Sequence, residues 1–365
     1  MSKVYFTDMR TSFTENLPKK LTRLIDRAGL GTIDFDHKFV AIKIHFGEMG
    51  NLAYLRPQYA RALAAYIKER GGLPFLTDCN TLYVGSRKNA LEHIETAYIN
   101  GYTPYATGCQ VIIADGVRGT DEAYIPIGCE EVKTAKIGRA IADADIIISL
   151  NHFKGHEDAG FGGALKNLGM GSGSRAGKME MHYDGKPVVD RDRCRGCCKC
   201  ATICANDGIH YENSKAVIDH DNCVGCGRCI AICSFDAIKP HNSSSAASLN
   251  RRIAEYAYAV VKDKPNFHIS IAADISPNCD CHPENDAPIV PNIGMFASFD
   301  PVAIDLAAAD AVNAMPANPR SALSEAECRC HDHFINVHPN TNWRVQIEHG
   351  EEIGLGSSEY ELIRI

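Results

Sequence analysis

The sequence lacks the features that would place the protein at a membrane or on a nucleic acid. No apolar run approaches the roughly 18 residues that a membrane-spanning helix needs, and the first residues, MSKVYFTDMR, are not a charged-then-apolar leader. Positive charge is not in excess: 38 Lys and Arg face 45 Asp and Glu, for a net charge of −7. We therefore expect a cytoplasmic protein that binds neither a membrane nor nucleic acid.

The named phosphate-binding loops are missing as well. Gly177-Lys178 resembles the end of a P-loop, but the first glycine of that motif would stand where the sequence has Ser172, and Met179 replaces the required Ser or Thr. No G-x-G-x-x-G run is present to bind a dinucleotide. The sequence therefore does not predict binding of ATP or of a dinucleotide.

Cysteine, in contrast, is abundant, with 16 residues. A chain of 365 residues does not need disulfides to be stable, so the C-x-x-C runs point to metal ligands in a reducing compartment. Residues 190–211 and 219–240 repeat one pattern with an offset of 29 positions, and each contains C-x2-C-x2-C-x3-C. This spacing is typical of bacterial proteins that hold two [4Fe–4S] clusters.

The repeat predicts which cysteines share a cluster. In two-cluster ferredoxins the fourth cysteine of each run binds the other cluster. The predicted ligand sets are therefore Cys194, Cys197, Cys200 and Cys233 for the first cluster, and Cys204, Cys223, Cys226 and Cys229 for the second. Cys198 is out of register, opposite Gly227, and we interpret it as a free thiol. A pair of zinc sites is the alternative, although zinc usually takes two C-x-x-C pairs separated by a longer loop.

One detail departs from plain ferredoxins. The proline that usually follows the fourth cysteine of each run is replaced by Ala205 and Ser234. The replacement loosens the local turn but removes no ligand.

Outside the repeat, strand-like and helix-like segments alternate. Short apolar runs predict buried strands at residues 40–45, 73–78, 110–115, 145–150, 267–274 and 293–298. Apolar residues recur at helical spacing between them, for example at Ala60, Leu63, Ala64 and Ile67, and at Leu249, Ile253, Tyr256 and Val260. The alternation predicts an α/β fold, with a mostly parallel sheet and helices on both faces. A small α+β two-cluster ferredoxin domain at 187–241 would interrupt this α/β domain, leaving its two parts at 1–186 and 242–365.

Each predicted strand ends in a chemically reactive residue type. The strand ends are His45, Asp78, Asp115, Asn151 with His152, Asp274, and Ser298 just before Asp300. In open α/β sheets, ligands bind outside the carboxyl ends of the strands. We therefore predict a shared cleft at that edge. The alternative is that polar residues merely end the strands.

The stretch 151–182 holds most of the candidate cleft residues. It combines many glycines with His152, Lys154, His156, Lys166, Asn167, Arg175, Lys178 and His182. Glycine lets backbone N–H groups approach a ligand, and GGALKN could begin a helix whose positive end attracts an anion. We predict a site for a carboxylate, a phosphate or a flavin-like anion, with His45, Asp78 and Asp274 at the same edge. A flexible glycine-rich loop with solvated bases is the alternative.

Two other groups of polar residues have simpler interpretations. Asp300 and Asp305 are explained by helix capping and by favourable charge in the first helical turn. We interpret His93 as a hydrogen-bonded histidine on its helix, beside an apolar stripe formed by Leu91, Ile94 and Tyr98.

Two C-x-C-H units lie outside the repeat. Together they could supply four thiolates and two imidazoles, enough for a third metal ion or cluster. Pro277 and Pro283 favour a turn that would bring the first pair of thiols together. Free thiols in a reducing compartment are the alternative. The residues concerned are Cys279, Cys281 and His282 in the first unit, and Cys328, Cys330 and His331 in the second.

Four segments resemble the domain-of-unknown-function 362 family: KIHFGEMGN, LTDCNTLYVGSR, NHFKGHEDAGFGGALKNLGMG and SFDPVAIDLAAAD. The resemblance covers nearly the whole chain, and family members with an embedded two-cluster ferredoxin are familiar. It implies an iron–sulfur protein of anaerobic metabolism, with no agreed reaction. It assigns no catalytic residue.

Together these features favour an iron–sulfur redox protein. Two [4Fe–4S] clusters would deliver electrons to a substrate, or to a second cofactor or metal, in the cleft. As an enzyme it would be an oxidoreductase, with a redox protein or a small anionic substrate as its partner. The sequence is also compatible with a bound flavin and with a homo-oligomer. Two alternatives stay open: a non-enzymatic electron carrier that docks a redox partner, and a factor that matures or reductively activates another protein's metallo-cofactor.

Overall fold

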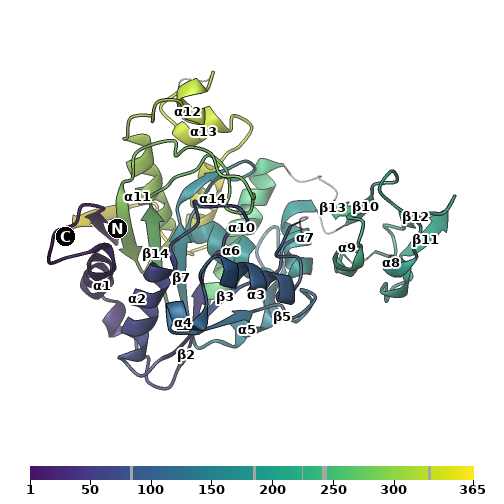
Figure 1. Cartoon of the computed structure of the whole chain (residues 1–365), viewed down its shortest axis with the longest axis horizontal. Coiled ribbons are helices and arrows are strands. Elements are labelled where there is room, and N and C mark those ends of the chain that lie inside the picture. Colours follow the sequence, from purple (N-terminus) through teal and green to yellow (C-terminus); the bar gives the residue numbers. More distant parts are fainter. Residues whose placement is uncertain (83–84, 184–185, 224, 241–244, 328–329) are drawn as a thin grey trace.

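The chain forms a mixed α/β fold around an eight-stranded sheet (Figure 1). The computed structural model describes residues 1–82, 85–183, 186–223, 225–240, 245–327 and 330–365. In spatial order the strands are β16 (Tyr360–Arg364), β1 (Ser2–Asp8), β15 (Gly294–Ser298), β14 (Asn266–Ala272), β7 (Ile146–His152), β2 (Phe39–Lys43), β3 (Leu73–Asp78) and β4 (Gln110–Ile113). The strands from β14 to β4 run parallel to one another, so the mostly parallel sheet is confirmed.

Strand β15 runs in the direction opposite to its neighbours. It is antiparallel to both β14 and β1, and Ser298 at its end pairs with His268 near the start of β14. Ser298 therefore lies at the opposite edge of the sheet from the predicted cleft, and the prediction for this strand end is wrong. A buried strand has a continuous apolar run whichever way it points, so its composition carries no information on direction.

Helices cover both faces of the sheet, as predicted. Strand residues alternate between the faces: Val40 and Ile148 pack into one apolar core, and Ala41 and Ile147 pack into the other. The first core is completed by α1 (Leu17–Arg27), α2 (Pro57–Lys68) and α3 (Ala90–Ile99), and α4 (Pro104–Thr107) packs against α2. The second is completed by α6 (Ala164–Ser172), α10 (Ala246–Val261), α11 (Pro301–Asn313) and α14 (Arg344–Glu352).

Two predicted helical stripes are confirmed and one is wrong. The apolar residues predicted for α2 and α10 are buried, and Ser245 caps α10 by accepting a hydrogen bond from the N–H of Ser248. In α3, however, Leu91 is 72% exposed, whereas His93 is completely buried. The buried face of the helix consists of Ala90, His93, Thr96 and Ala97, and Nε2 of His93 lies 3.8 Å from Oδ2 of Asp78.

The cysteine-rich segment forms a small lobe at one end of the molecule (Figure 1). Its two ends meet where β10 (Pro187–Val189) pairs antiparallel with β13 (Ile238–Pro240). The sequence repeat is also a structural repeat, since Cys198 and Gly227 both adopt the left-handed backbone, with φ of 61° and 66°. The domain boundaries at 187 and 241 remain a prediction. Between the paired ends lie α8 (Lys199–Thr202), β11 (Ile209–Glu212), β12 (Lys215–Ile218) and α9 (Arg228–Ile232).

Shorter elements connect the larger ones. In the described ranges, no helix is both long enough and apolar enough to cross a membrane. The short elements are η1 (Leu30–Thr32), β5 (Glu122–Pro126), β6 (Thr134–Gly138), α5 (Arg139–Asp143), β8 (Lys154–His156), β9 (Gly160–Gly162), α7 (Arg175–Tyr183), α12 (Ala322–Glu325) and α13 (His333–Val337).

Candidate functional site

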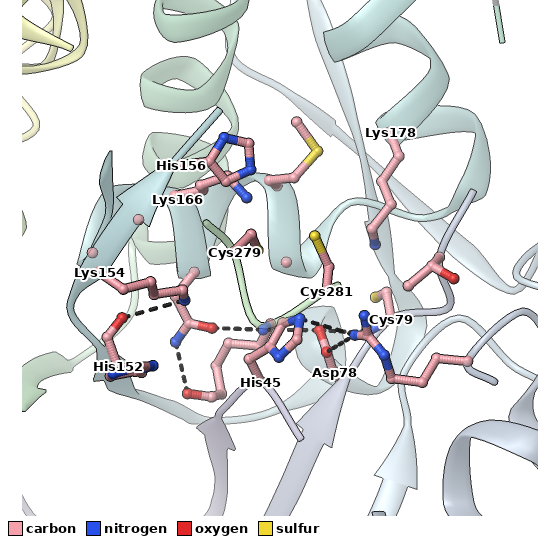
Figure 2. A pocket seen from close by; sticks show the side chains of 18 of the residues that line it. His45, Asp78, Cys79, His152, Lys154, His156, Lys166, Lys178, Cys279 and Cys281 are labelled. Atoms are coloured by element: carbon pink, nitrogen blue, oxygen red, sulfur yellow. Dashed lines mark hydrogen bonds and ion pairs between the residues drawn. The ribbon is translucent and has the colours of Figure 1, made fainter. Parts of the chain in front are cut away.

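A pocket lies at the carboxyl edge of β2, β3 and β7, where the sequence predicts a cleft (Figure 2). Its wall includes eight residues predicted for that cleft, namely His45, Asp78, His152, Lys154, His156, Lys166, Asn167 and Lys178. Arg175 and His182, from the same glycine-rich stretch, belong to α7, and of the two only His182 lines the pocket.

Asp274 is a further cleft candidate that does not line this pocket. Strand β14 ends at Ala272, and Asp274 adopts a left-handed backbone with φ of 51°. Its carboxylate lies 3.3 Å from the guanidinium of Arg56 at the surface. The turn at Asp274 redirects the chain, so that the following residues, including Cys279 and Cys281, reach the pocket in its place.

The floor of the pocket is organised around the Asp78 carboxylate. Oδ1 of Asp78 lies 2.9 Å from Nζ of Lys43, and Oδ2 lies 3.9 Å from the guanidinium of Arg87 and 3.8 Å from His93. Burial alone would raise the pKa of Asp78, but the charge of the neighbouring Lys43 ammonium outweighs it and lowers the pKa below its usual value. Lys43 also donates a hydrogen bond of 2.8 Å to Asn167. Asp78 is therefore ionised at neutral pH and fixes Lys43 in place.

His93 corrects a prediction from the sequence. The expected hydrogen-bonded histidine is completely buried, and neither ring nitrogen has a hydrogen-bond partner among the described residues. Burial lowers the pKa of His93 well below its ordinary value, which keeps the ring neutral. The ring packs edge-on against Phe46, with centroids 5.7 Å apart.

Positive charge dominates the pocket wall. Nζ of Lys178 is held by the carbonyl oxygen of Gly173 at 2.6 Å, and the residue is 8% exposed. Within the described ranges, neither Lys178 nor Lys166 has a carboxylate within 4 Å. Lys166 is half-buried and Lys178 is buried, and a buried cation without a paired anion is costly, so the pocket favours an anionic ligand. The cationic side chains of the wall are Lys43, Arg87, Lys154, Lys166 and Lys178, against the carboxylates of Asp78 and Glu157.

The positive end of α6 is not available to an external anion. The Asp305 carboxylate accepts hydrogen bonds from the N–H groups of Ala164 and Leu165, the latter at 2.9 Å. Asp305 therefore caps α6 and does not act in the first turn of its own helix, which corrects the prediction. Asp300 does cap α11, since its carboxylate accepts hydrogen bonds from the N–H groups of Val302 and Ala303. Burial raises the pKa of Asp305 to about 7.

The first C-x-C-H unit reaches the pocket, where Cys279 and Cys281 line the wall. The thiols of Cys279 and Cys281 contact each other, which lowers the pKa of Cys279 well below its usual value because the remaining S–H stabilises one thiolate. Between them, Asp280 points away from the pocket and bonds to Nδ1 of His152 at 2.8 Å. Lys154 Nζ lies 3.5 Å from the same carboxylate. Asp280 thus anchors the turn that presents both thiols.

The second C-x-C-H unit does not join the first in the part of the chain that the structure describes. The thiol of Cys330 donates a hydrogen bond of 2.9 Å to Asn336, and Cys330 and His331 are exposed and absent from the pocket wall. Cys328 lies outside the described residues. A metal bound jointly by both units is therefore not favoured by the placement of Cys330.

The eight cysteines of the repeat surround two hollows in the small lobe. Backbone N–H groups point at the sulfurs: Ala216 donates to Cys194 Sγ at 3.4 Å, and Ala237 donates to Cys233 Sγ at 3.3 Å. Cys198 lines neither hollow and is exposed. The first hollow is lined by Cys194, Cys197, Cys200 and Cys233, and the second by Cys204, Cys223, Cys226 and Cys229. The grouping is the one that the crossed pattern predicts.

Helix α7 lies between the pocket and the second hollow. Lys178 and His182, four residues apart, face the pocket. Met179 belongs to the apolar cluster of the cysteine lobe, together with Cys229. Gly227, in the wall of the second hollow, lies so close to Arg175 that an added Cβ would be 2.7 Å from its side chain.

The model of the domain of unknown function DUF362 matches residues 40–310, about three quarters of the chain. The chain belongs to the DUF362 family. No curated protein matches it. Among solved structures, the lactate racemase apoprotein from Thermoanaerobacterium thermosaccharolyticum is similar at 11% identity and a TM-score of 0.42, over 75% of this chain and 51% of that one. A protein from Thermotoga maritima is similar at 13% identity and a TM-score of 0.37, over 73% and 51%.

The DUF362 chain thus spans about half the length of each of these two proteins. Neither likeness is close enough to transfer an activity. What the pocket can do chemically follows from its own residues: it can hold an anion between buried cations, and it presents a pair of thiols at one end.

The sequence does not predict Arg87, which lines the pocket, or Glu48, which lies behind it. Arg87 and Glu48 form a buried ion pair of 3.1 Å, and Nη1 of Arg87 lies 2.9 Å from Nε2 of His45. Burial, followed by the charge of Arg87, lowers the pKa of His45 to about 3. Neither Arg87 nor Glu48 stands at a strand end or in a metal-ligand pattern, so no signal in the sequence identifies them. Asp115 does stand at a strand end, but it is buried behind the pocket, where it bonds to the N–H of Asn80 at 2.9 Å.

Proposed function

We propose that this chain is an iron–sulfur redox protein in which two [4Fe–4S] clusters deliver electrons to an anionic substrate or second cofactor in the cation-lined pocket. The observation that carries the proposal is the position of α7. One face of this helix supplies Lys178 and His182 to the pocket, and its other face, through Met179, packs in the cysteine lobe. Leu82 also lines the pocket and belongs to the apolar cluster of the cysteine lobe, so the path between the pocket and the lobe is short.

The two hollows fit the proposed clusters. Each is lined by four thiols of the crossed pattern, and backbone N–H groups donate to the sulfurs of Cys194 and Cys233, an interaction that tunes cluster potentials. Cys200 also contacts the hydroxyl of Tyr211 at 3.1 Å. When bound, such clusters supply one-electron transfer. All described cysteines are free of disulfides, as ligation requires.

The two repeats differ in exposure, which favours the first cluster as the one that a partner protein meets. In the first repeat Cys197 and Cys198 are exposed, whereas the equivalent Cys226 and Gly227 of the second are half-buried and buried against the main body. The first hollow is therefore the side that a redox partner protein can reach. Electrons would then pass from the first cluster to the second and on to the pocket.

The substrate class follows from the charge of the pocket. Lys166 and Lys178 lack carboxylate partners within 4 Å among the described residues, so both are available to a carboxylate, a phosphate or a flavin-like anion. Lys43 and Asp78 already neutralise each other and would position neighbouring groups rather than bind the anion. Oxidoreductase chemistry on a small anion is the activity that this arrangement supports best.

The test uses anaerobically prepared protein with chemically reduced clusters. Rapid mixing with a panel of small carboxylates and phosphorylated compounds should identify an acceptor whose reoxidation of the clusters saturates with concentration. A Lys166→Gln/Lys178→Gln variant should keep its iron yet lose this acceptor-dependent rate. Reoxidation only by another protein, equal in wild type and variant, would contradict the proposal and favour a non-enzymatic carrier.

A further inference from the structure

A thiol, an imidazole and a carboxylate from two separate parts of the chain come together at the wall of the pocket. The ligand atoms of Glu157, Cys281 and His282 all lie within 4.8 Å of one another, and Nε2 of His282 is 3.0 Å from Oε1 of Glu157. Glu157 follows β8, whereas Cys281 and His282 stand on the turn beyond β14. We propose that these three side chains bind one thiophilic divalent metal ion, with zinc as the working probe.

The donor set suits such an ion. Thiolate, imidazole and carboxylate are the side chains that hold zinc, and three protein ligands are typical of sites that keep an open position for water or substrate. Oε2 of Glu157 is buried without a hydrogen-bond partner among the described residues, so it has a lone pair free for an ion. Because Cys281 and Glu157 also line the pocket, the open position faces the space in which we place the anion.

His282 is oriented for ligation. Its Nδ1 lies 3.1 Å from Oε1 of Glu284, and its Nε2 points to Glu157. A metal-binding histidine usually donates its second ring N–H to a carboxylate, which fixes the tautomer and the direction of the ligating nitrogen. Glu284 takes that position here. An ion bound at Nε2 would take over the contact that His282 now makes with Glu157.

Two neighbours are excluded from the ligand set. Nδ1 of His156 accepts hydrogen bonds from the N–H groups of Asp158 and Ala159, at 3.0 and 3.1 Å, so the ring proton is on Nε2 and that nitrogen has no lone pair to give. Cys279 is not within 4.8 Å of all three ligand atoms. Its sulfur instead contacts Cys281 and His156.

The metal site deepens the proposed function by naming a second cofactor in the pocket, yet it can be tested apart from the clusters. Iron and zinc are measured on the same anaerobic full-length protein after exhaustive desalting. We expect about one zinc per chain in the wild type after zinc loading. Cys281→Ser and Glu157→Gln should lose most of that zinc, with iron unchanged. A wild-type protein that binds the zinc but lacks the iron would count against the clusters and leave the zinc site intact.

Matched variants separate ligation from general damage. Cys129→Ser changes a half-buried thiol outside both sites and should keep the zinc. Cys279→Ser should also keep it. Glu284→Gln removes only the support of His282 and should weaken zinc affinity about 10–100-fold. Zinc bound equally by wild type and Cys281→Ser, or lost equally in Cys129→Ser, would overturn the assignment.

Discussion

Nζ of Lys43 lies 2.9 Å from Oδ1 of Asp78, and the two side chains are only 1% and 4% exposed. They extend from the carboxyl ends of the neighbouring parallel strands β2 and β3. This buried pair forms the floor of the pocket and holds Asn167 of α6 through a second contact of Lys43. The Lys43–Asp78 pair therefore links the ends of β2 and β3 to helix α6.

Breaking this pair should be costly. Asp78→Ala leaves the Lys43 ammonium buried without its partner, and we expect the free energy of unfolding to fall by about 3–5 kcal/mol. Urea denaturation of the variant and the wild type measures the difference. The control is Asp8→Ala, which breaks the pair with Lys20 at a carboxylate that is 52% exposed, and should cost about 0–1 kcal/mol. Equal losses in the two variants would contradict the role given to Asp78.

His268 should make stability depend on pH. Burial lowers its pKa to about 3, whereas the pKa of a histidine in the unfolded chain is about 6.5. Its stabilising contribution is fully present above the higher value and is lost as pH falls, because only the unfolded chain takes up the proton. Near pH 5.5, the slope of the unfolding free energy against pH should therefore be smaller in His268→Gln than in the wild type, by about 1.4 kcal/mol per pH unit.

Urea denaturation at several pH values checks this prediction. The exposed His37 provides the matched control, and His37→Gln should leave the slope at its wild-type value. A wild-type slope in His268→Gln would show that this buried ring does not cause the dependence.

Adjacent cysteines in the first repeat should behave differently. Cys197 lines the first hollow, whereas Cys198 is exposed and lines neither hollow. We expect Cys197→Ser to lose iron or alter the signal of one cluster, and Cys198→Ser to match the wild type in both respects. Iron analysis and electron paramagnetic resonance of the reduced proteins measure this. Loss of iron in Cys198→Ser alone would reverse the ligand assignment.

Gly227 should matter for transfer rather than for cluster binding. Its φ is 66°, and a Cβ would lie 2.7 Å from the side chain of Arg175 on α7. We expect Gly227→Val to push the lobe away from α7, to keep its iron, and to slow reoxidation by a pocket acceptor. Cys198→Val is the control, because it makes the same side chain at the equivalent position of the exposed repeat. Unchanged rates in Gly227→Val would argue against the route past α7.

Local patterns predict much of this molecule. The grouping of cysteines follows from the spacing of the repeat, and the parallel strands follow from their alternation with helices. Most of the predicted cleft residues line one pocket because carboxyl ends of parallel strands meet at one edge. The antiparallel β15 is not predicted, since the apolar run Gly294–Ser298 looks the same in either direction.

Contacts between residues far apart in the sequence explain the other features that the sequence does not predict correctly. Asp305 caps a helix that begins 141 residues earlier, which no local capping pattern reveals. Helix α3 buries His93, 3.8 Å from Asp78, and leaves Leu91 of the predicted apolar stripe exposed. Glu157 approaches His282 across 125 positions. Each depends on how the sheet edge assembles, and a single sequence does not carry that information.

The central claim is tested most directly by iron and acid-labile sulfide analysis of protein prepared without air, together with its electron paramagnetic resonance after reduction. The proposal predicts about eight iron and eight sulfide per chain, with signals from two interacting [4Fe–4S] clusters. About four iron with a single cluster signal, or zinc in place of iron in the two hollows, would contradict it.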